Sequence, residues 1–334
     1  MKIAINGFGR IGRSVFRILN NRDNIDVVAI NDIFDKDALT YLLKYDTVMG
    51  RFPEEVTLNG DILKTQSQSV KLVAERDPSS LPWNELGVDI VIESTGIFRQ
   101  RDQLQYHINA GAKRVVLTVP SKDEIDYTVV LGVNDDGLRP EHKIVSNASC
   151  TTNCLAPIVS IIHKNFEILK GQITTIHNPT NTNVLLDKPH KDLRRARSSM
   201  LSMHPTSTGS AKAIGLIFPE LNGKLDGHAV RVPVINSSLT DCVFQLNKNC
   251  KASEVNNLFK RAAEQELKGI LGIEFNPLVS IDFVNDTRSS IVDAPSTLVT
   301  DSNLLKIYSW YDNETGYACR MSDIAKMVYN SLNV

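Results

Sequence analysis

Residues 1–19 read MKIAINGFGRIGRSVFRIL, and this stretch decides the fold of the N-terminal half. A β-branched run leads into the motif GFGRIG at residues 7–12, and an apolar stripe with helical spacing follows. Strand, glycine-rich turn and helix in this order form the fingerprint G-x-G-x-x-G. Its first glycine permits a tight turn, its second lets the backbone approach a pyrophosphate, and its third permits close helix–strand packing. The stretch therefore predicts a dinucleotide site.

The neighbouring residues indicate which dinucleotide is bound. Amides and the dipole at a helix N-terminus attract phosphates, so Gly9, Arg10 and Ile11 are predicted to bind the cofactor, with Arg10 adding a positive charge. Asp32 follows the second predicted strand, where an acid accepts hydrogen bonds from the adenosine ribose. Because a carboxylate there repels a 2′-phosphate, the sequence predicts NAD rather than NADP.

Short strand-like runs alternate with helical segments up to residue 149. This alternation is typical of βαβ units in a mostly parallel sheet. We therefore predict an α/β fold in which residues 1–149 form a Rossmann domain with a doubly wound parallel sheet. The predicted strands are Ile3–Asn6, Val27–Asn31, Asp89–Glu93, Arg114–Thr118 and Ile144–Ser146.

The pattern changes after Cys150. Polar segments lengthen, and we predict an α+β catalytic domain over residues 150–314 with a mixed, largely antiparallel sheet. Residues 315–334 carry an apolar stripe and are predicted to form an amphipathic helix that packs with the first domain. The strand-like runs of the second domain include Gly227–Asn236, Thr240–Leu246 and Leu305–Trp310.

Length and composition limit the functional classes. A chain of 334 residues is long enough for two domains, and 42% hydrophobic with 22% charged residues is ordinary for a globular protein. A net charge of −1 gives no overall attraction to nucleic acid or an anionic membrane. The start, Met1–Ile5, lacks the apolar run of a signal peptide, and five scattered cysteines lack metal-ligand spacing. We expect a cytoplasmic protein without bound metal, nucleic acid or membrane.

Cys150 is the candidate nucleophile, because it lies between a predicted strand and a predicted helix in SNASCTTNC. A cysteine at a helix N-terminus has its thiolate stabilised by the dipole and unpaired amides, and these amides can hold an oxyanion. Cys154 is expected to be a small buried hydrophobic residue. His177 ends the β-rich run Ile173–Ile176. It can activate the thiol as a base, although a lone histidine fits a structural role equally well.

Taken together, the motifs resemble those of phosphorylating glyceraldehyde-3-phosphate dehydrogenases over essentially the whole chain. The resemblance implies NAD as cofactor and a homotetramer in which the loop near residues 180–200 lines a neighbouring cofactor site. It also implies oxidation of glyceraldehyde 3-phosphate with inorganic phosphate through a thioester on Cys150. The motifs are NGFGRIGR, AINDIFD, KYDTVMGRF, ERDP, ESTGIF, SNASCTTNCLAP, TTIH, PHKDLRRAR, STGSAKA, PELNGKL, AVRVP and WYDNE.

The resemblance assigns roles to the positions that match these motifs. Cys150 becomes the nucleophile and His177 its base. Asn313 holds the nicotinamide carboxamide, with Tyr317 packed nearby. The other cofactor-binding residues that it implies are Arg76 and Thr118.

The resemblance also implies two anion sites, one for inorganic phosphate and one for the substrate phosphate. Hydroxyls and an amide fix the orientation of a phosphate, and arginine supplies charge in a fixed donor fork. Arg194 and Arg197 are expected instead in ion pairs at a subunit interface. The first site comprises Ser149, Thr151, Thr208 and Gly209, and the second Thr180, Arg195 and Arg231.

Three places depart from the family pattern. The run after His177 is NPTNTN, where the family has an aromatic residue and an acid, so the wall of the substrate-phosphate site is expected to differ. A tryptophan of the family is Thr315 here, and a leucine is Lys188. If Lys188 reaches a neighbour's ribose, it would partly offset Asp32 and soften the preference for NAD.

Other functions stay open on sequence alone. TNTN and HKDLRRARSSMLS also resemble a branch associated with arsenate resistance, in which arsenate replaces phosphate and gives 1-arseno-3-phosphoglycerate. Erythrose-4-phosphate dehydrogenase shares the cysteine and histidine, but the intact run STGSAK at residues 207–212 argues against it. A non-catalytic NAD-binding or RNA-binding protein is a third alternative, and scattered charge with few aromatic residues makes RNA the weaker one.

Overall fold

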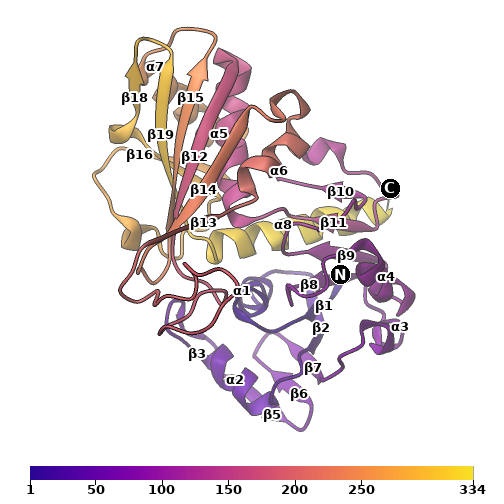
Figure 1. The fold of residues 1–334 in the computed structure, drawn as a ribbon. Coiled ribbons are helices and arrows are strands. Elements are labelled where there is room, and N and C mark those ends of the chain that lie inside the picture. The colour runs from indigo at the N-terminus through magenta and orange to yellow at the C-terminus, as the bar shows by residue number, and fades with distance from the viewer. Residues whose placement is uncertain (334) are drawn as a thin grey trace. The chain divides into compact units, whose positions relative to one another are not determined.

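The computed structural model describes residues 1–333, which form two compact units. One unit comprises Met1–Ser149 and the chain from Ala318 onward, and the other comprises Cys150–Tyr317. Figure 1 shows the elements of both. Within the described residues, none of the helices combines the length and the apolar character needed to cross a bilayer.

The first unit is built on a nine-stranded sheet with β1 (Lys2–Asn6) at its centre (Figure 1). β1 pairs in parallel with β2 (Asp26–Asn31) on one side and β8 (Ile90–Glu93) on the other. The chain therefore winds outward in both directions from β1, which confirms the predicted doubly wound parallel sheet. The full order is β10-β11-β9-β8-β1-β2-β7-β6-β5, with β9 at Arg114–Leu117, β10 at Tyr127–Thr128 and β11 at Ile144–Ser146.

One edge of this sheet has an antiparallel meander that the sequence did not predict. It consists of β5 (Thr57–Asn59), β6 (Ile62–Lys64) and β7 (Ser69–Val73), and β7 joins β2 in parallel. These strands are short and their alternation is brief, so no periodicity marks them. A separate hairpin pairs β3 (Tyr45–Asp46) with β4 (Gly50–Arg51).

The helix α1 (Arg10–Leu19) buries a face that differs slightly from the predicted stripe, which consists of Ile11, Val15, Ile18 and Leu19. Val15, Phe16 and Leu19 are fully buried, whereas Ile18 is only half-buried. The face is rotated because Phe16 packs edge-on against the Phe8 ring, 5.8 Å between centroids. The other helices of this unit are α2 (Lys36–Lys44), α3 (Trp83–Leu86), α4 (Arg101–Asn109), η1 (Pro78–Ser80) and η2 (Asp135–Gly137).

The second unit contains a sheet of eight strands, which is mixed and largely antiparallel, as predicted. Its order is β13-β14-β12-β15-β19-β17-β16, with β18 paired to β19, and only β12/β14 and β16/β17 are parallel. The long central strands are β12 (Ile168–His177), β15 (Ser238–Leu246) and β19 (Leu304–Tyr311). The others are β13 (His204–Ser207), β14 (Leu225–Arg231), β16 (Leu271–Glu274), β17 (Ser290–Asp293) and β18 (Leu298–Thr300).

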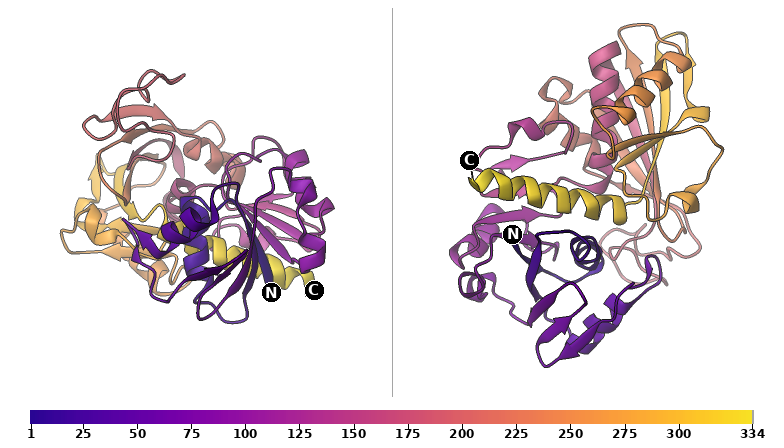
Figure 2. Two further views of the ribbon diagram at one scale, coloured as in Figure 1. Left: turned by 90° about the horizontal axis from the view of Figure 1, so that it is seen from below. Right: turned by 180° about the vertical axis from the view of Figure 1, so that it is seen from behind.

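Helices α5 (Cys150–Phe166) and α7 (Ala252–Glu264) lie on one face of this sheet, as the view from behind in Figure 2 shows. Cys154, inside α5, is fully buried, as expected. The predicted strand Gly227–Asn236 is wrong at its end, because β14 stops at Arg231 and Pro233 cannot donate to a ladder. The other helical segments are α6 (Ser210–Ile217), η3 (Pro219–Leu221), η4 (Ser280–Phe283) and η5 (Ala294–Ser296).

The last helix, α8, runs over Thr315–Asn330 and is followed by η6 (Ser331–Asn333). The apolar stripe predicted for residues 315–334 consists of Tyr317, Met321, Ile324, Val328 and Leu332. Met321, Ile324 and Val328 are fully buried, while Leu332 lies beyond the helix and is half-buried. The part of α8 from Ala318 onward belongs to the first unit.

A buried chain of polar side chains links four elements of the first unit. Trp83 Nε1 donates to His107 Nδ1 over 3.0 Å, so His107 carries its proton on Nε2. That nitrogen lies 3.0 Å from Glu93 Oε2, which also accepts from Asn6 Nδ2 over 2.5 Å. The Thr95 amide donates to the other oxygen of Glu93 over 2.8 Å. Because Glu93 and His107 are fully buried, each bond replaces one that water would supply.

We predict that His107→Leu destabilises this unit. The substitution removes a donor from a buried carboxylate and an acceptor from the Trp83 indole, so the free energy of unfolding should fall by about 3 kcal/mol. Urea unfolding followed by circular dichroism measures the change. His228→Leu, at an exposed histidine, is the control and should change stability by less than about 0.5 kcal/mol. Equal effects of the two substitutions would contradict the argument.

Candidate active site

Cys150 is the first residue of α5. Ala148, two residues earlier, has a φ of +53°, a left-handed conformation that is unfavourable for a residue other than glycine. Burial raises the pKa of the Cys150 thiol, whereas a hydrogen bond with Thr151 and the charge of Arg231 act to lower it. Burial outweighs these effects, so the thiol is protonated at neutral pH. Ionisation of Cys150 therefore needs a neighbouring base.

His177, the last residue of β12, lies beside this thiol. Its Nε2 is 3.8 Å from Cys150 Sγ, and its ring packs edge-on against Tyr311 with centroids 6.2 Å apart. Burial, followed by the charge of Arg231, lowers the pKa of His177 to about 3, so the imidazole is neutral at pH 7. A neutral imidazole next to a protonated thiol is the arrangement used in cysteine nucleophilic catalysis. This geometry favours the base over the purely structural role.

Arg231 ends β14, and the parallel register with β12 places it opposite His177. Its Nη1 lies 2.7 Å from His177 Nδ1 and 2.7 Å from the main-chain oxygen of Asn178. On the other side, the register partner of Arg231 is His204 of β13. Within residues 1–333, Arg231 forms no ion pair with a carboxylate. A half-buried guanidinium without a counter-charge is suited to bind an anion.

Positive charge gathers around Arg231. Arg195 Nε donates to Thr206 Oγ1 over 2.8 Å and is 3.6 Å from Asp192. Burial lowers the pKa of His204, and the charges of Arg231 and Arg195 lower it further. The structure thus brings together two of the three residues predicted for the substrate phosphate. It adds His204, which no sequence pattern placed there.

Three of the remaining predicted anion ligands, Thr180, Thr208 and Gly209, lie in the loop after β12 and near the start of α6. Thr180 Oγ1 lies 3.0 Å from Thr182 Oγ1 in the loop after β12. Thr208 Oγ1 lies 3.0 Å from Ser210 Oγ, and Gly209 is the N-cap of α6. No hydrogen bond joins Thr180 or Thr208 to Cys150 or His177 in the described chain, so their assignment stays a prediction.

Tyr311 is a site residue that the sequence analysis missed. Its hydroxyl lies 2.8 Å from Thr151 Oγ1, the residue after Cys150, and its ring contacts His177. Burial raises the pKa of Tyr311 well above its ordinary value, so the phenol stays protonated. The available signal was alternation along β19, where Tyr311 shares the buried face with Leu305 and Ile307.

Asn313 follows β19 and is held in one orientation. Ser238 Oγ donates to Asn313 Oδ1 over 2.9 Å, which turns the amide nitrogen the other way as a donor. Tyr317 is buried in the first turn of α8. Thr315, at the family's tryptophan position, donates its amide to Asp312 Oδ1 over 2.8 Å and so stabilises the start of α8.

Asn178 begins the run that differs from the family pattern, and its side-chain amide donates to neighbouring main-chain groups. Its side chain donates to the main-chain oxygens of Pro179 and Ile235, over 3.2 and 3.3 Å. Its own main-chain oxygen lies 2.8 Å from His177 Nδ1. The backbone therefore keeps an acceptor against the imidazole whatever side chain residue 178 carries.

The glycine-rich turn has the shape that a dinucleotide requires. Gly7 has a φ of +93°, and a Cβ there would meet the Thr95 nitrogen at 2.7 Å. A Cβ on Gly12 would meet the Gly7 oxygen at 2.1 Å, whereas one on Gly9 would meet nothing within 4 Å. The turn is thus closed toward the sheet and open at Gly9, where a phosphate can approach the backbone. Ile11 is half-buried in the first turn of α1.

Asp32 holds the end of β2 against this turn. Its Oδ2 accepts from the Phe8 amide over 2.7 Å, and its Oδ1 accepts from the Phe34 amide over 3.0 Å. A carboxylate has further lone pairs for ribose hydroxyls. The charge expected from Arg10 is balanced instead, because its guanidinium bonds Asp46 over 2.9 and 3.2 Å. Asp46, in the KYDTVMGRF segment, was not predicted.

The two other predicted cofactor residues differ in setting. Thr118 is buried, and its main-chain amide donates to the main-chain oxygen of Glu93 over 3.0 Å at the carboxyl ends of β8 and β9. Arg76 is exposed after β7. Of the two, only Thr118 is fixed by main-chain pairing.

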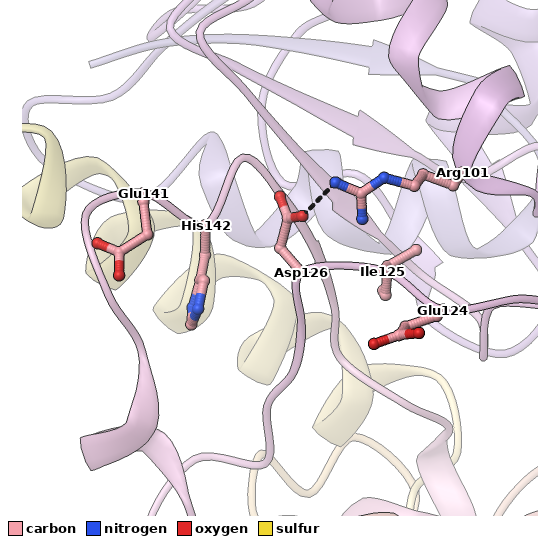
Figure 3. Close-up of a pocket in the computed structure, with 6 residues that line it drawn as sticks. All are labelled: Arg101, Glu124, Ile125, Asp126, Glu141 and His142. Carbon is pink, nitrogen blue, oxygen red and sulfur yellow. Dashed lines mark hydrogen bonds and ion pairs between the residues drawn. The ribbon is translucent and has the colours of Figure 1, made fainter.

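A further hollow of about 490 Å³ lies in the first unit (Figure 3). Arg101, which lines this hollow, forms an ion pair with Asp126, since its Nη2 lies 2.5 Å from Asp126 Oδ1. None of the predicted site residues lines it, and among the described residues no cluster of three or more potential metal ligands was found. The lining residues are Arg101, Glu124, Ile125, Asp126, Glu141 and His142.

Comparison with known proteins identifies the family. Residues 1–101 match the description "Glyceraldehyde 3-phosphate dehydrogenase, NAD binding domain", and residues 149–313 match its "C-terminal domain". The glyceraldehyde-3-phosphate dehydrogenase of Geobacillus stearothermophilus is 51% identical over 329 residues, which cover 98% of each chain. The chain belongs to the glyceraldehyde-3-phosphate dehydrogenase family.

Two further relatives carry the same family name. Glyceraldehyde-3-phosphate dehydrogenase 1 of Bacillus cereus is 52% identical over 325 residues, 97% of each chain. The glyceraldehyde-3-phosphate dehydrogenase of Borreliella burgdorferi is 51% identical over 333 residues, 98% of this chain and 99% of the relative. Family membership confirms the NAD-dependent oxidoreductase class and NAD as cofactor, as predicted.

We predict that Asp32→Ala raises kcat/KM with NADP relative to NAD. The loss of a negative charge removes repulsion of the 2′-phosphate, and one such interaction corresponds to a change of about tenfold in the ratio. Steady-state kinetics with both cofactors measures it. Asp35→Ala removes the same charge three residues later, at the N-cap of α2, and should leave the ratio unchanged. A similar shift in both variants would contradict a specific role of Asp32.

Proposed function

We propose that this chain oxidises glyceraldehyde 3-phosphate with NAD and inorganic phosphate to 1,3-bisphosphoglycerate. The observation that carries the proposal is the Cys150–His177 pair at 3.8 Å, next to a half-buried arginine without a carboxylate partner within residues 1–333. Thiol and imidazole account for the covalent step, and Arg231 accounts for a substrate that carries a phosphate group.

His177 takes the thiol proton on Nε2, and Cys150 Sγ attacks the aldehyde carbon to form a hemithioacetal. Amides at the start of α5 face the oxygen that gains negative charge. The His177 imidazolium gives its proton to the hemithioacetal oxygen and takes it back as a hydride leaves the same carbon to form the thioester. NAD would supply the hydride acceptor when bound. A phosphate oxygen then displaces Sγ, which releases the acyl phosphate and regenerates the thiolate. Each step uses Cys150 and His177 in roles that their geometry supports.

The proposal extends to domains and ligand sites. Residues 1–149, with the C-terminal helix, form the NAD-binding domain, and residues 150–314 form the catalytic domain. The glycine turn is closed toward the sheet at Gly7 and Gly12 and open at Gly9. This shape supports a cofactor site formed by Gly9, Arg10, Ile11 and Asp32. Because Ser238 occupies Asn313 Oδ1, the side-chain amide nitrogen of Asn313 is oriented as a donor, which supports binding of the nicotinamide carboxamide, with Tyr317 beside it. Arg76 and Thr118 complete the proposed cofactor set, and the proposed anion ligands are Ser149, Thr151, Thr180, Arg195, Thr208, Gly209 and Arg231.

The alternatives are not favoured. The relatives named above carry the plain glyceraldehyde-3-phosphate dehydrogenase name, not that of an erythrose-4-phosphate enzyme. Arsenate as the second acceptor has the same tetrahedral shape as phosphate, and it is separated from phosphate by the assay below. An effect of Lys188 on cofactor choice stays a prediction, because Lys188 is exposed and, within residues 1–333, only its main chain is bonded, to Ala196.

The assay follows NADH absorbance with glyceraldehyde 3-phosphate, NAD and either phosphate or arsenate. We expect phosphate-dependent NADH formation that Cys150→Ser lowers by at least about 10⁴-fold, since the covalent route is lost. Cys154→Ser, at a buried thiol that does not contact His177, is the matched control and should retain activity. Turnover in Cys150→Ser, or faster turnover with erythrose 4-phosphate, would overturn the proposal. A strict requirement for arsenate would favour the arsenate-using alternative.

We also propose a cytoplasmic homotetramer. The loop after β12 exposes large apolar side chains, among them Leu185 (70% exposed), Leu193 (81%) and Leu201 (89%). Exposed apolar groups concentrated in one segment are typical of an interface between subunits.

Light scattering should therefore give four times the chain mass of 37.1 kDa. Leu201→Asp should lower that mass by placing a charge in the contact, whereas Leu304→Asp, at a partly exposed position on β19, should not. A monomeric wild-type protein would contradict the assembly.

A further inference from the structure

The two contacts of His177 Nδ1 are compatible with two alternative hydrogen-bond patterns. Arg231 Nη1 lies 2.7 Å from Nδ1, and the Asn178 oxygen lies 2.8 Å from the same nitrogen. A guanidinium nitrogen can only donate, and a carbonyl oxygen can only accept. Nδ1 therefore accepts from Arg231 when it lacks a proton, or donates to Asn178 when it has one. It cannot do both.

The first pattern disables the base. When Arg231 donates to Nδ1, the proton of the neutral ring sits on Nε2, the atom 3.8 Å from Cys150 Sγ. An N–H then faces the thiol, and the ring has no lone pair for the thiol proton. Ionisation of Cys150 must release its proton to solvent, and burial of the thiol makes this unfavourable.

The second pattern allows His177 to act as the base. With its proton on Nδ1, His177 donates to the Asn178 oxygen and turns the Nε2 lone pair toward Sγ. The S–H bond breaks as the Nε2–H bond forms, giving a thiolate and an imidazolium that keeps its bond to Asn178. Arg231 Nη1 must leave Nδ1 in this pattern, because two N–H groups would otherwise point at each other.

We propose that Arg231 sets the tautomer of His177, and that an oxyanion of the phosphate class enables proton acceptance by drawing Arg231 away from Nδ1. Arg231 is thus a positioning residue for the base. The proposal rests on the anion-binding role given to Arg231 above, and goes beyond it by coupling that role to the proton.

Two features of Arg231 make it responsive to an anion. Its Nε is buried and has no hydrogen-bond partner within the described residues, so a donor is available to a new acceptor. The nearby charge of Arg195 acts on it unfavourably. An oxyanion would satisfy the donor and balance both charges. Leaving Nδ1 costs Arg231 one hydrogen bond, which the anion replaces.

Alkylation of Cys150 by iodoacetamide tests the proposal with inorganic phosphate as the probe. Wild-type full-length enzyme at pH 7 should react about tenfold faster with saturating phosphate than in chloride buffer, the effect of one pKa unit on the thiolate fraction. Arg231→Met removes the donor to Nδ1, so it should react at the fast rate without phosphate and show no response to it. Arg197→Met, which removes an exposed arginine paired with Asp187, should behave like the wild type.

The sign of the Arg231→Met effect decides between two explanations. If Arg231 acted only as a positive charge near the thiol, its removal would slow alkylation. Slower alkylation in Arg231→Met therefore overturns the proposal, as does a wild-type rate that phosphate leaves unchanged. Neither result touches the proposed dehydrogenase function, which fails only if the wild type forms no NADH.

A spectroscopic measurement on the wild type keeps the test valid if Arg231→Met does not fold. Nitrogen chemical shifts of labelled histidine distinguish the two tautomers in solid-state NMR, with His177→Asn used for assignment. We expect the Nε2–H form in chloride and a shift to the Nδ1–H form, or to the imidazolium, with phosphate. An Nδ1–H ring in chloride would overturn the proposal.

Discussion

The parallel register between β12 and β14 is the constraint on which the thiol site depends. It pairs His177 with Arg231 at the ends of the two strands. Gly227, opposite Ile173, restricts this pairing, because a Cβ at Gly227 would meet the Ile173 oxygen at 2.0 Å. Strands slipped by one residue would present the opposite face and set a valine of β14 against the imidazole. A glycine four residues upstream thus helps to decide which side chain the base contacts.

Around this pair, burial and the charge of Arg231 act on the pKa of the thiol in opposite directions and on the pKa of the imidazole in the same direction. Burial keeps the thiol protonated and the imidazole neutral, so neither group is reactive by its own ionisation. Their proximity allows one proton to move between them without exchange with water. Tyr311 closes one side of the imidazole, and its buried hydroxyl holds Thr151 next to the nucleophile. The site is therefore an arrangement of protonated and neutral groups that becomes ionic during the reaction.

The sequence predicted those features that local patterns encode. The strand–turn–helix at residues 1–19, the parallel strands of the first sheet and the position of Cys150 at a helix start all follow from spacing within short segments. Contacts that join distant segments were not encoded in this way. Arg231 meets His177 across 54 positions of chain, and Asp46 meets Arg10 across 36. Family resemblance named Arg231 as an anion ligand, but only the strand register revealed its bond to the base.

The buried chain from Trp83 through His107 to Glu93 has a consequence for how the sequence can change over time. Each member satisfies the next, so replacement of any one leaves a polar atom without a partner in the interior. A viable substitution at one position therefore requires a matching change at another. The three positions should be inherited together among relatives, and lineages that lose the histidine should also have replaced the carboxylate. This part of the fold evolves as a unit, whereas an exposed residue such as His228 is free to vary alone.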